Sequence, residues 1–209
     1  QRQMCIRDSG LTDRALYGRT LSAGIIDFMA QYYTYGSGSD MNSMVGAYRY
    51  EEDEIKAIFQ SAWEKAYALI VNCNIIIEKC DAKREVLSDV YYGLYKGEAI
   101  ALRAMLHLDM LRLFGPIMAK NPDGRGIPYN ESTDPQILSI MPAGTVLKDY
   151  IIRDLTEAEA LLLASDPVLT EGPRAEYDEV SQDNSMRYRQ LRLNYYATCL
   201  LYTSDAADD

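Results

Sequence analysis

Tyrosine is concentrated in residues 31–50, QYYTYGSGSDMNSMVGAYRY, where it alternates with Gly, Ser, Asn and Asp. A tyrosine ring offers an apolar face on which a sugar ring can stack, and its hydroxyl adds a hydrogen-bonding tip at low entropic cost. Carboxylate and amide groups beside it can bind sugar hydroxyls. These residue types suit an oligosaccharide, and we expect ligand contacts from Tyr33, Tyr35, Asp40 and Asn42 in this loop. The alternative is that the rings pack onto the helices beneath them.

Catalysis and metal binding find little support in the sequence. His107 is the only histidine, and without a second histidine or a suitably placed cysteine it cannot complete a familiar zinc site. No Ser-His-Asp motif accompanies it, so we expect a structural role for His107. A pair of carboxylates could still cleave a glycosidic bond, but nothing selects two acids from the many in the chain. We therefore expect no catalytic residue, no cofactor and no metal.

Two cysteines lie on one predicted helix. Cys73 and Cys80 are about 10 Å apart along its axis, at the usual rise of roughly 1.5 Å per residue. That separation exceeds the reach of a disulfide, so we expect both to be buried free thiols.

Two long helices are predicted where apolar residues recur at alternating steps of three and four. The first spans residues 51–81, and Trp63 and Tyr67 form an adjacent stripe, so this helix is expected to pack on two sides. The second spans residues 87–114 and ends at Gly115-Pro116, because Gly suits a helix end and Pro cannot continue one.

Small and charged residues share the middle of the second helix. Gly97, Ala101 and Ala104 lie on its apolar stripe and allow another helix to approach closely. Because the link between the two long helices is short, we expect an antiparallel hairpin in which they touch along these three residues. Glu98 and Arg103 are too far apart round the helix to pair with each other, so each is expected to anchor a neighbouring helix or loop.

The rest of the chain continues the helical pattern. A connection rich in Pro, Gly, Asn and Asp covers residues 117–141, a third helix is predicted over residues 143–164, and a fourth begins near RYRQLRLNYYAT. No convincing strand alternation occurs. The predicted fold class is all-α, with tetratricopeptide-like helical hairpins and long irregular loops.

Composition limits the possible partners. The net charge is −10, and an acidic chain does not offer the phosphate-neutralising surface that nucleic acid needs. Apolar residues make up 48 % of the chain, which suits a globular domain. No run approaches the roughly 18 consecutive apolar residues of a membrane helix.

The two ends of the chain have an unusual relationship. If residues 1–9 are back-translated with suitable codons, the reverse complement encodes Cys-Leu-Leu-Tyr-Thr-Ser-Asp-Ala, which is residues 199–206. An inverted sequencing adapter read as coding sequence gives this result, and the DNA resembles a transposase-type adapter. We therefore expect residues 1–9 and 199–209 to be adapter-derived, and residues 10–198 to be a partial helical domain.

Several motifs occur in the order and spacing of one known family. WEKAYALIVNCN, residues 63–74, resembles the Trp-x-x-x-Tyr-x-x-Ile-x-x-x-Asn helix of the SusD/RagB family. GEAIALRA, residues 97–104, resembles that family's Gly-Glu-Ala-x-x-x-Arg-Ala helix, which ends in Phe-Gly. GIPY, LKDYIIRDLTEAEALL and LNYYA follow in the family's order, and the resemblance spans residues 48–198.

The resemblance carries expectations about fold and function. It implies a truncated SusD-like fold in which Glu98 and Arg103 are polar residues that hold the structure. Family members are surface-exposed lipoproteins of the outer membrane that bind nutrients, usually oligosaccharides, for a SusC-like TonB-dependent transporter. We therefore expect an oligosaccharide or other nutrient ligand, that transporter as partner, a lipid anchor outside this fragment, and no enzymatic activity. A tetratricopeptide-type protein-interaction scaffold and a glycan-cleaving enzyme remain alternatives.

The residues expected to have a structural rather than a ligand-binding role are Trp63, Tyr67, Gly97, Glu98, Ala101, Arg103 and Ala104.

Overall fold

The computed structural model describes residues 10–22, 24–33, 38, 40–134, 138–171 and 193–206. Helices dominate these ranges, and no β-strand occurs within them. One isolated antiparallel bridge joins Arg125 and Pro142. None of the described helices is both long enough and apolar enough to cross a membrane.

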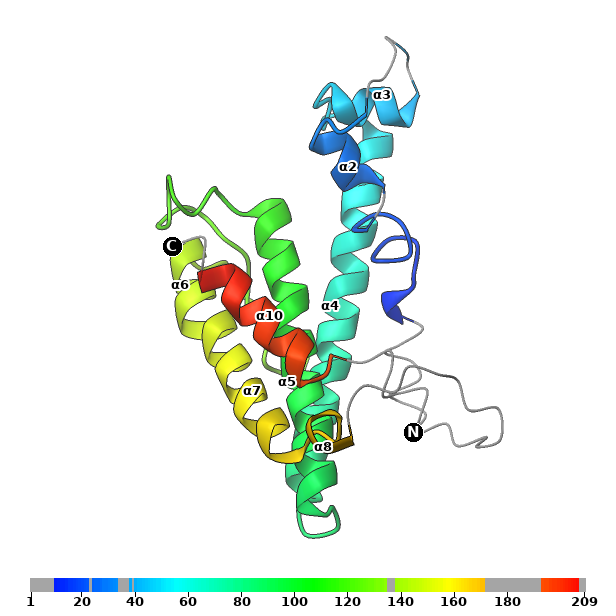
Figure 1. Cartoon of the computed structure of the whole chain (residues 1–209). Helices are drawn as coiled ribbons and strands as arrows, with labels where there is room; N and C mark the ends of the chain where they lie inside the picture. The colour runs from blue at the N-terminus through cyan, green and yellow to red at the C-terminus, as the bar shows by residue number, and fades with distance from the viewer. Residues whose placement is uncertain are drawn as a thin grey trace, which may run out of the picture. The chain divides into compact units, whose positions relative to one another are not determined.

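The helices follow one another along the chain as labelled in Figure 1. They are α2 (Ile25–Met29), α3 (Met41–Gly46), α4 (Asp53–Ala82), α5 (Asp89–Phe114), α6 (Ala143–Thr145), the π-helix η1 (Val146–Ile151), α7 (Ile152–Ser165), α8 (Val168–Glu171) and α10 (Tyr195–Ala206). By its residue contacts the chain divides into two compact units, Gln1–Leu69 and Ile70–Asp209, and α4 contributes to both.

The first unit contains α2, α3 and the first part of α4. Its core joins these elements through Ile25, Met44, Val45 and Ile55. The prediction of a loop over residues 31–50 was wrong for its second half, because α3 occupies six of those residues. Partly buried apolar residues complete this core: Phe28, Met29, Tyr50, Ile58 and Phe59.

The left-handed residue that follows each short helix of this unit is not glycine. Gln31 follows the last turn of α2 with φ 58°, and Tyr48 follows that of α3 with φ 55°. A left-handed residue directly after the cap is a common helix ending, but it is usually Gly, since a side chain there is strained. The usual sequence signal for these two helix ends is therefore missing.

The second unit contains the predicted antiparallel hairpin. Lys96 and Tyr92 of α5 bind Asp81 near the end of α4, whereas Arg103, further along α5, binds Asn74, earlier in α4. The order of the pairs reverses between the helices, so within this unit they run in opposite directions. Their shared cluster of buried residues is Ile76, Cys80 and Ala99. Cys73 and Cys80 are buried free thiols, as expected.

The small residues of α5 meet a helix that was not expected there. A Cβ added at Gly97 would lie 2.9 Å from Cγ of Leu162 on α7, and Ala101 clusters with Ala158 of the same helix. Gly97 therefore faces α7, so the expectation that it meets α4 was wrong, whereas the cluster of Ala101 includes Ile77 of α4 as well as Ala158 of α7. Helix α5 is covered on two sides: Figure 1 shows it between the second part of α4 and α7, with α10 crossing α7.

The predicted third helix is divided into three parts. Residues 143–164 were expected as one α-helix, but the π-helix η1 separates α6 from α7. A π-helical turn widens the backbone by one residue. Helix α10 continues through Ala206, past the predicted end of the genuine chain at Thr198.

Candidate ligand-binding site

The turn before α3 is held by Asp40. Its carboxylate accepts hydrogen bonds from the backbone N–H groups of Asn42 (3.0 Å) and Ser43 (3.2 Å) and from the Ser43 hydroxyl (2.6 Å). The Ser43 hydroxyl is the main reason that the pKa of this carboxyl is lowered below its ordinary value. Asp40 is thus the N-cap of α3. Its carboxylate pairs backbone N–H groups of the first turn, including that of Asn42, and so fixes the position of Asn42.

A cavity of about 350 Å³ lies within the first unit. Its volume is near the lower end of the range for small-molecule sites. Segments from the N-terminal coil, α2, α3 and α4 surround it, so distant parts of this unit meet at one place. The lining residues are Arg14, Ala15, Arg19, Thr20, Gly24, Ile25, Phe28, Met41, Asn42, Ala57, Ile58 and Ser61.

Of the four expected ligand residues, one lines this cavity and another adjoins it. Asn42 is a lining residue. The ring of Tyr33 lies 5.5 Å from that of Phe28, also a lining residue, and 56 % of Tyr33 is exposed. Asp40 precedes Asn42 by two residues, whereas Tyr35 lies outside the described residues. The structure therefore brings Tyr33, Asp40 and Asn42 to one side of the first unit.

Two other tyrosines of the same segment pack as the alternative interpretation expected. The Tyr48 hydroxyl donates to the carbonyl of Met29 (3.1 Å), and its ring lies edge-on to Tyr50. The Tyr50 ring lies edge-on to Phe59 of α4, 5.8 Å away. Partial burial raises the pKa of Tyr50. These contacts fasten the end of the segment to the helices. Tyr32 is more exposed than Tyr33, but Tyr33 is the one whose ring contacts a cavity residue, Phe28.

Trp63 and Tyr67 lie together on α4. Their ring centroids are 4.6 Å apart with the planes 31° from parallel. Burial raises the pKa of the Tyr67 phenol well above its ordinary value. An aromatic pair one helical turn apart adds packing energy beyond the area it buries, which is compatible with the expected structural role.

A buried polar cluster in the second unit surrounds Arg103. Its guanidinium donates to Asp154 of α7 (Nε, 2.7 Å) and to Asn74 of α4 (Nη1, 3.0 Å). The Tyr129 hydroxyl donates to the same Asp154 oxygen at 2.5 Å, and Asp154 is fully buried. Arg103 thus connects α4, α5, α7 and the loop that carries Tyr129. Glu98, also expected to anchor a neighbour, is 1 % exposed on α5.

His107 belongs to this cluster. Its Nδ1 lies 2.8 Å from the Arg103 carbonyl, and its Nε2 accepts the Asn130 N–H at 3.1 Å. Its ring stacks on Tyr129 with 3.9 Å between centroids. Burial lowers the pKa of His107 to about 3. Within the described part of the chain, no group of three or more His, Cys, Asp or Glu side chains could hold a metal ion.

The sequence did not indicate several residues of these two sites. Arg14, Arg19 and Ser61 line the cavity, but nothing in their spacing distinguishes them from surface residues. Asp154 binds Arg103, and Tyr129 binds Asp154, but they lie 51 and 26 positions after Arg103, and such pairs leave no local periodicity. Their motifs, GIPY and IIRDL, were noted only for their order along the chain.

A family profile described as "Starch-binding associating with outer membrane" (SusD-like) matches residues 27–171. The chain belongs to this SusD-like family. No curated protein sequence matches it. Two solved structures share its fold.

The first is a proposed sugar-binding protein from Bacteroides vulgatus ATCC 8482, with 18 % identity and a TM-score of 0.65. The second is a SusD superfamily protein from Bacteroides thetaiotaomicron VPI-5482, with 17 % identity and a TM-score of 0.68. The likeness covers 99 % of this chain in both cases, but 41 % and 42 % of the two relatives. This SusD-like chain therefore spans about two fifths of the length of the relatives it matches.

Proposed function

We propose that this SusD-like chain binds an oligosaccharide at the cell surface and delivers it to a SusC-like TonB-dependent transporter. The observation that carries the proposal is the family match, whose description joins starch binding with the outer membrane. One of the two structural relatives is itself described as a sugar-binding protein, which supports a saccharide ligand. A lipid anchor would hold the protein at the outer membrane.

The cavity of the first unit is the proposed place of binding. Its wall combines apolar side chains with amide, hydroxyl and guanidinium groups, the mixture that a sugar's C–H faces and hydroxyls require. The exposed ring of Tyr33 offers a stacking surface beside it, and Asn42 offers an amide. We assign ligand contacts to Tyr33, Tyr35, Asp40 and Asn42, and Asp40 has the further task of holding α3.

The proposed mechanism is binding without turnover. A sugar ring stacks on an aromatic side chain and exchanges hydrogen bonds with water for hydrogen bonds with the protein, so the net free energy per contact is small. Modest affinity suits a carrier, because the ligand has to leave for the transporter.

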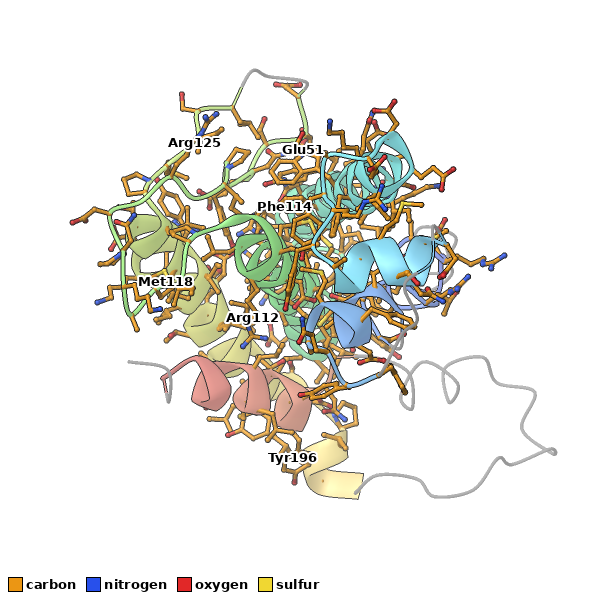
Figure 2. The ribbon with its side chains drawn as sticks, turned by 90° about the horizontal axis from the view of Figure 1, so that it is seen from above. Glu51, Arg112, Phe114, Met118, Arg125 and Tyr196 are labelled. Carbon is orange, nitrogen blue, oxygen red and sulfur yellow. The ribbon has the colours of Figure 1, made fainter. Side chains whose placement is uncertain are left out.

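Isothermal titration of the complete gene product against a panel of oligosaccharides tests the proposal. We expect at least one glycan to bind, and we expect Tyr33→Ala and Asn42→Ala to weaken its binding. Tyr196→Ala is the matched control, since Tyr196 lies on α10 in the second unit and is 51 % exposed, close to the value for Tyr33 (Figure 2). Absence of binding across the panel, or cleavage of a bound glycan, would contradict the carrier role.

A further inference from the structure

The cavity of the first unit is cationic although the chain is acidic. Arg14 and Arg19 both line it, and no Asp or Glu is among those of its lining residues that the structure describes. The chain as a whole has a net charge of −10. The charge contributed by these two guanidiniums is therefore opposite in sign to the net charge of the chain.

Three carboxylates are adjacent in the sequence to lining residues, but Asp13, Asp27 and Asp40 are not themselves lining residues. Asp13, beside Arg14, accepts the Ala15 N–H at 2.9 Å and lies 3.3 Å from the ammonium of Lys65. Asp40, beside the cavity residue Met41, accepts hydrogen bonds from Asn42 and Ser43 in the first turn of α3, which offset part of its negative charge. Among the residues that the structure describes, neither Arg14 nor Arg19 forms an ion pair. Both side chains are exposed, so their charges are available to a ligand.

The two arginines come from one closed turn. The backbone N–H and the hydroxyl of Thr20 both donate to the Arg14 carbonyl, at 3.1 and 2.8 Å. Leu16, between the arginines, is completely buried and anchors the turn. Because the backbone of this turn is already fixed, ligand binding loses less conformational entropy there.

The remaining lining residues define what else the ligand must contain. Six of them are apolar and suit the C–H face of a sugar ring: Ala15, Ile25, Phe28, Met41, Ala57 and Ile58. Thr20, Asn42 and Ser61 can exchange hydrogen bonds with hydroxyls. A neutral sugar offers these guanidiniums only hydroxyl and ring oxygens as acceptors, whereas a carboxylate or sulfate offers bidentate, charge-assisted hydrogen bonds, which are stronger.

We propose that this cavity binds an anionic saccharide, a sugar carrying a carboxylate or a sulfate ester, with Arg14 and Arg19 holding the anion. The proposal rests on the glycan-binding function proposed above and narrows its ligand class. Because the planar guanidinium fork can donate two parallel hydrogen bonds to two oxygens of either anion, arginine is better suited to this task than lysine.

The test is isothermal titration of the complete gene product with three oligosaccharides of equal length, one neutral, one containing uronic acid and one sulfated. The variants are R14Q/R19Q, which removes both charges, and R14K/R19K, which keeps them without the planar fork. The control is R125Q, because Arg125 is an exposed arginine on the loop after α5 in the second unit (Figure 2). Circular dichroism verifies that each variant is folded.

We expect one of the two anionic ligands to bind at least about tenfold more tightly than the neutral one. R14Q/R19Q should abolish this preference, R14K/R19K should reduce it, and R125Q should leave it unchanged. The anionic oligosaccharide with the higher affinity, uronate or sulfated, identifies the negative group that the cavity recognises. Equal binding of neutral and anionic glycans, or an anionic preference that survives in R14Q/R19Q, overturns this inference and leaves the proposed glycan binding intact. If no glycan of any kind binds, both proposals fail.

Discussion

Arg103 and Asp154 place opposite charges in the interior of the second unit, and their surroundings explain how this is tolerated. Arg103 is 6 % exposed and Asp154 is fully buried, so both have lost most of their hydration. Arg153 and Glu131 add a second pair, with 2.5 Å between their charged groups and 2.8 Å from Arg153 to Asp154. Two cations thus face two anions, and hydrogen bonds from Tyr129 and to Asn74 satisfy remaining polar atoms. Such a cluster favours one arrangement of helices more than it adds stability.

Removing one member of this cluster should be costly. We expect Asp154→Asn to lower the free energy of unfolding by about 3–5 kcal/mol, because it removes the buried counter-charge of Arg103 and leaves only the exposed Glu131, 3.7 Å away, to face two guanidiniums. Urea denaturation measures the change. Glu157→Gln is the matched control on α7, since Glu157 is exposed and its oxygen is 3.9 Å from Lys96, and such a surface pair contributes at most about 1 kcal/mol. Similar losses in the two variants would contradict the structural role of Asp154.

His107 makes the same cluster sensitive to acid. Its two ring nitrogens are used differently, since Nε2 accepts the Asn130 N–H and Nδ1 faces a carbonyl, to which it can donate. Only the neutral ring with its hydrogen on Nδ1 satisfies both contacts. The folded-state pKa of about 3 lies below the unfolded value of about 6.5, so the unfolded chain takes up a proton that the folded chain excludes.

The stability due to neutral His107 is present above about pH 6.5 and is lost progressively as the pH falls toward 3. Between pH 7 and pH 5 we expect this group to remove about 2 kcal/mol from the free energy of unfolding. Urea denaturation at both values, on the unmodified protein and on His107→Gln, isolates the contribution. The variant should lose about 2 kcal/mol less over that interval. An equal loss in both proteins would show that other groups determine the acid sensitivity.

The contact between helices α5 and α7 depends on two glycines, which have no side chain. Gly93 and Gly97 lie on one side of α5, where an added Cβ would come within 2.5 Å of Ser165 and 2.9 Å of Leu162. Glycine inside a helix costs up to about 1 kcal/mol in propensity relative to alanine. Close approach of α7 compensates for that cost, because it allows the two helices to bury Ala101 and Ala158 between them.

Gly97→Ala tests this contact, since two opposing effects predict different signs. Helix propensity alone would stabilise the protein by up to about 1 kcal/mol, whereas overpacking against Cγ of Leu162 should destabilise it by about 1–3 kcal/mol. We expect the overpacking to dominate, because Cγ is close to the backbone and cannot move away freely. A double-mutant cycle with Leu162→Ala, followed by thermal unfolding, measures the coupling. Additive effects would mean that Gly97 and Leu162 do not determine the helix approach.

Elements with long periodic patterns could be predicted from the sequence, and short ones could not. The two long helices were expected over residues 51–81 and 87–114. Each observed helix, α4 and α5, begins two residues after its predicted start and ends within one residue of its predicted end. Helices α2 and α3 have five and six residues, too few for helical periodicity to show. Their left-handed endings at Gln31 and Tyr48 also lack the usual Gly signal.

The candidate site was predictable in part. Tyr33, Asp40 and Asn42 were identified by residue type, but the N-cap role of Asp40, the exposure of Tyr33 and the cavity were not. It forms where the turn containing Arg14 and Arg19 meets α2, α3 and α4, and this meeting depends on tertiary packing. For the same reason the sequence indicated small residues on α5 without showing that α7 lies against them.

The free energy of local opening should differ between the two units of the molecule. The first unit has a modest core around Ile55 and contains an open cavity. The second unit contains the hairpin, α7 and the buried cluster around Arg103. Local opening free energies depend on buried contacts and satisfied polar groups, so the second unit should open only with global unfolding. Because α4 contributes to both units, it should change from low to high protection along its length.

Amide hydrogen exchange, followed by mass spectrometry on the intact protein, measures this gradient. We expect peptides from residues 55–69 to exchange faster than those from residues 70–82, although both belong to one continuous helix. Asp154→Asn provides the control, because it destabilises the second unit. It should accelerate exchange in residues 70–82 and leave exchange in residues 55–69 unchanged, provided that global unfolding is still rarer than local opening of the first unit. A saturating glycan should slow exchange in the first unit, since ligand binding stabilises the state that binds it. Uniform protection along α4 would mean that the chain opens as a single cooperative body.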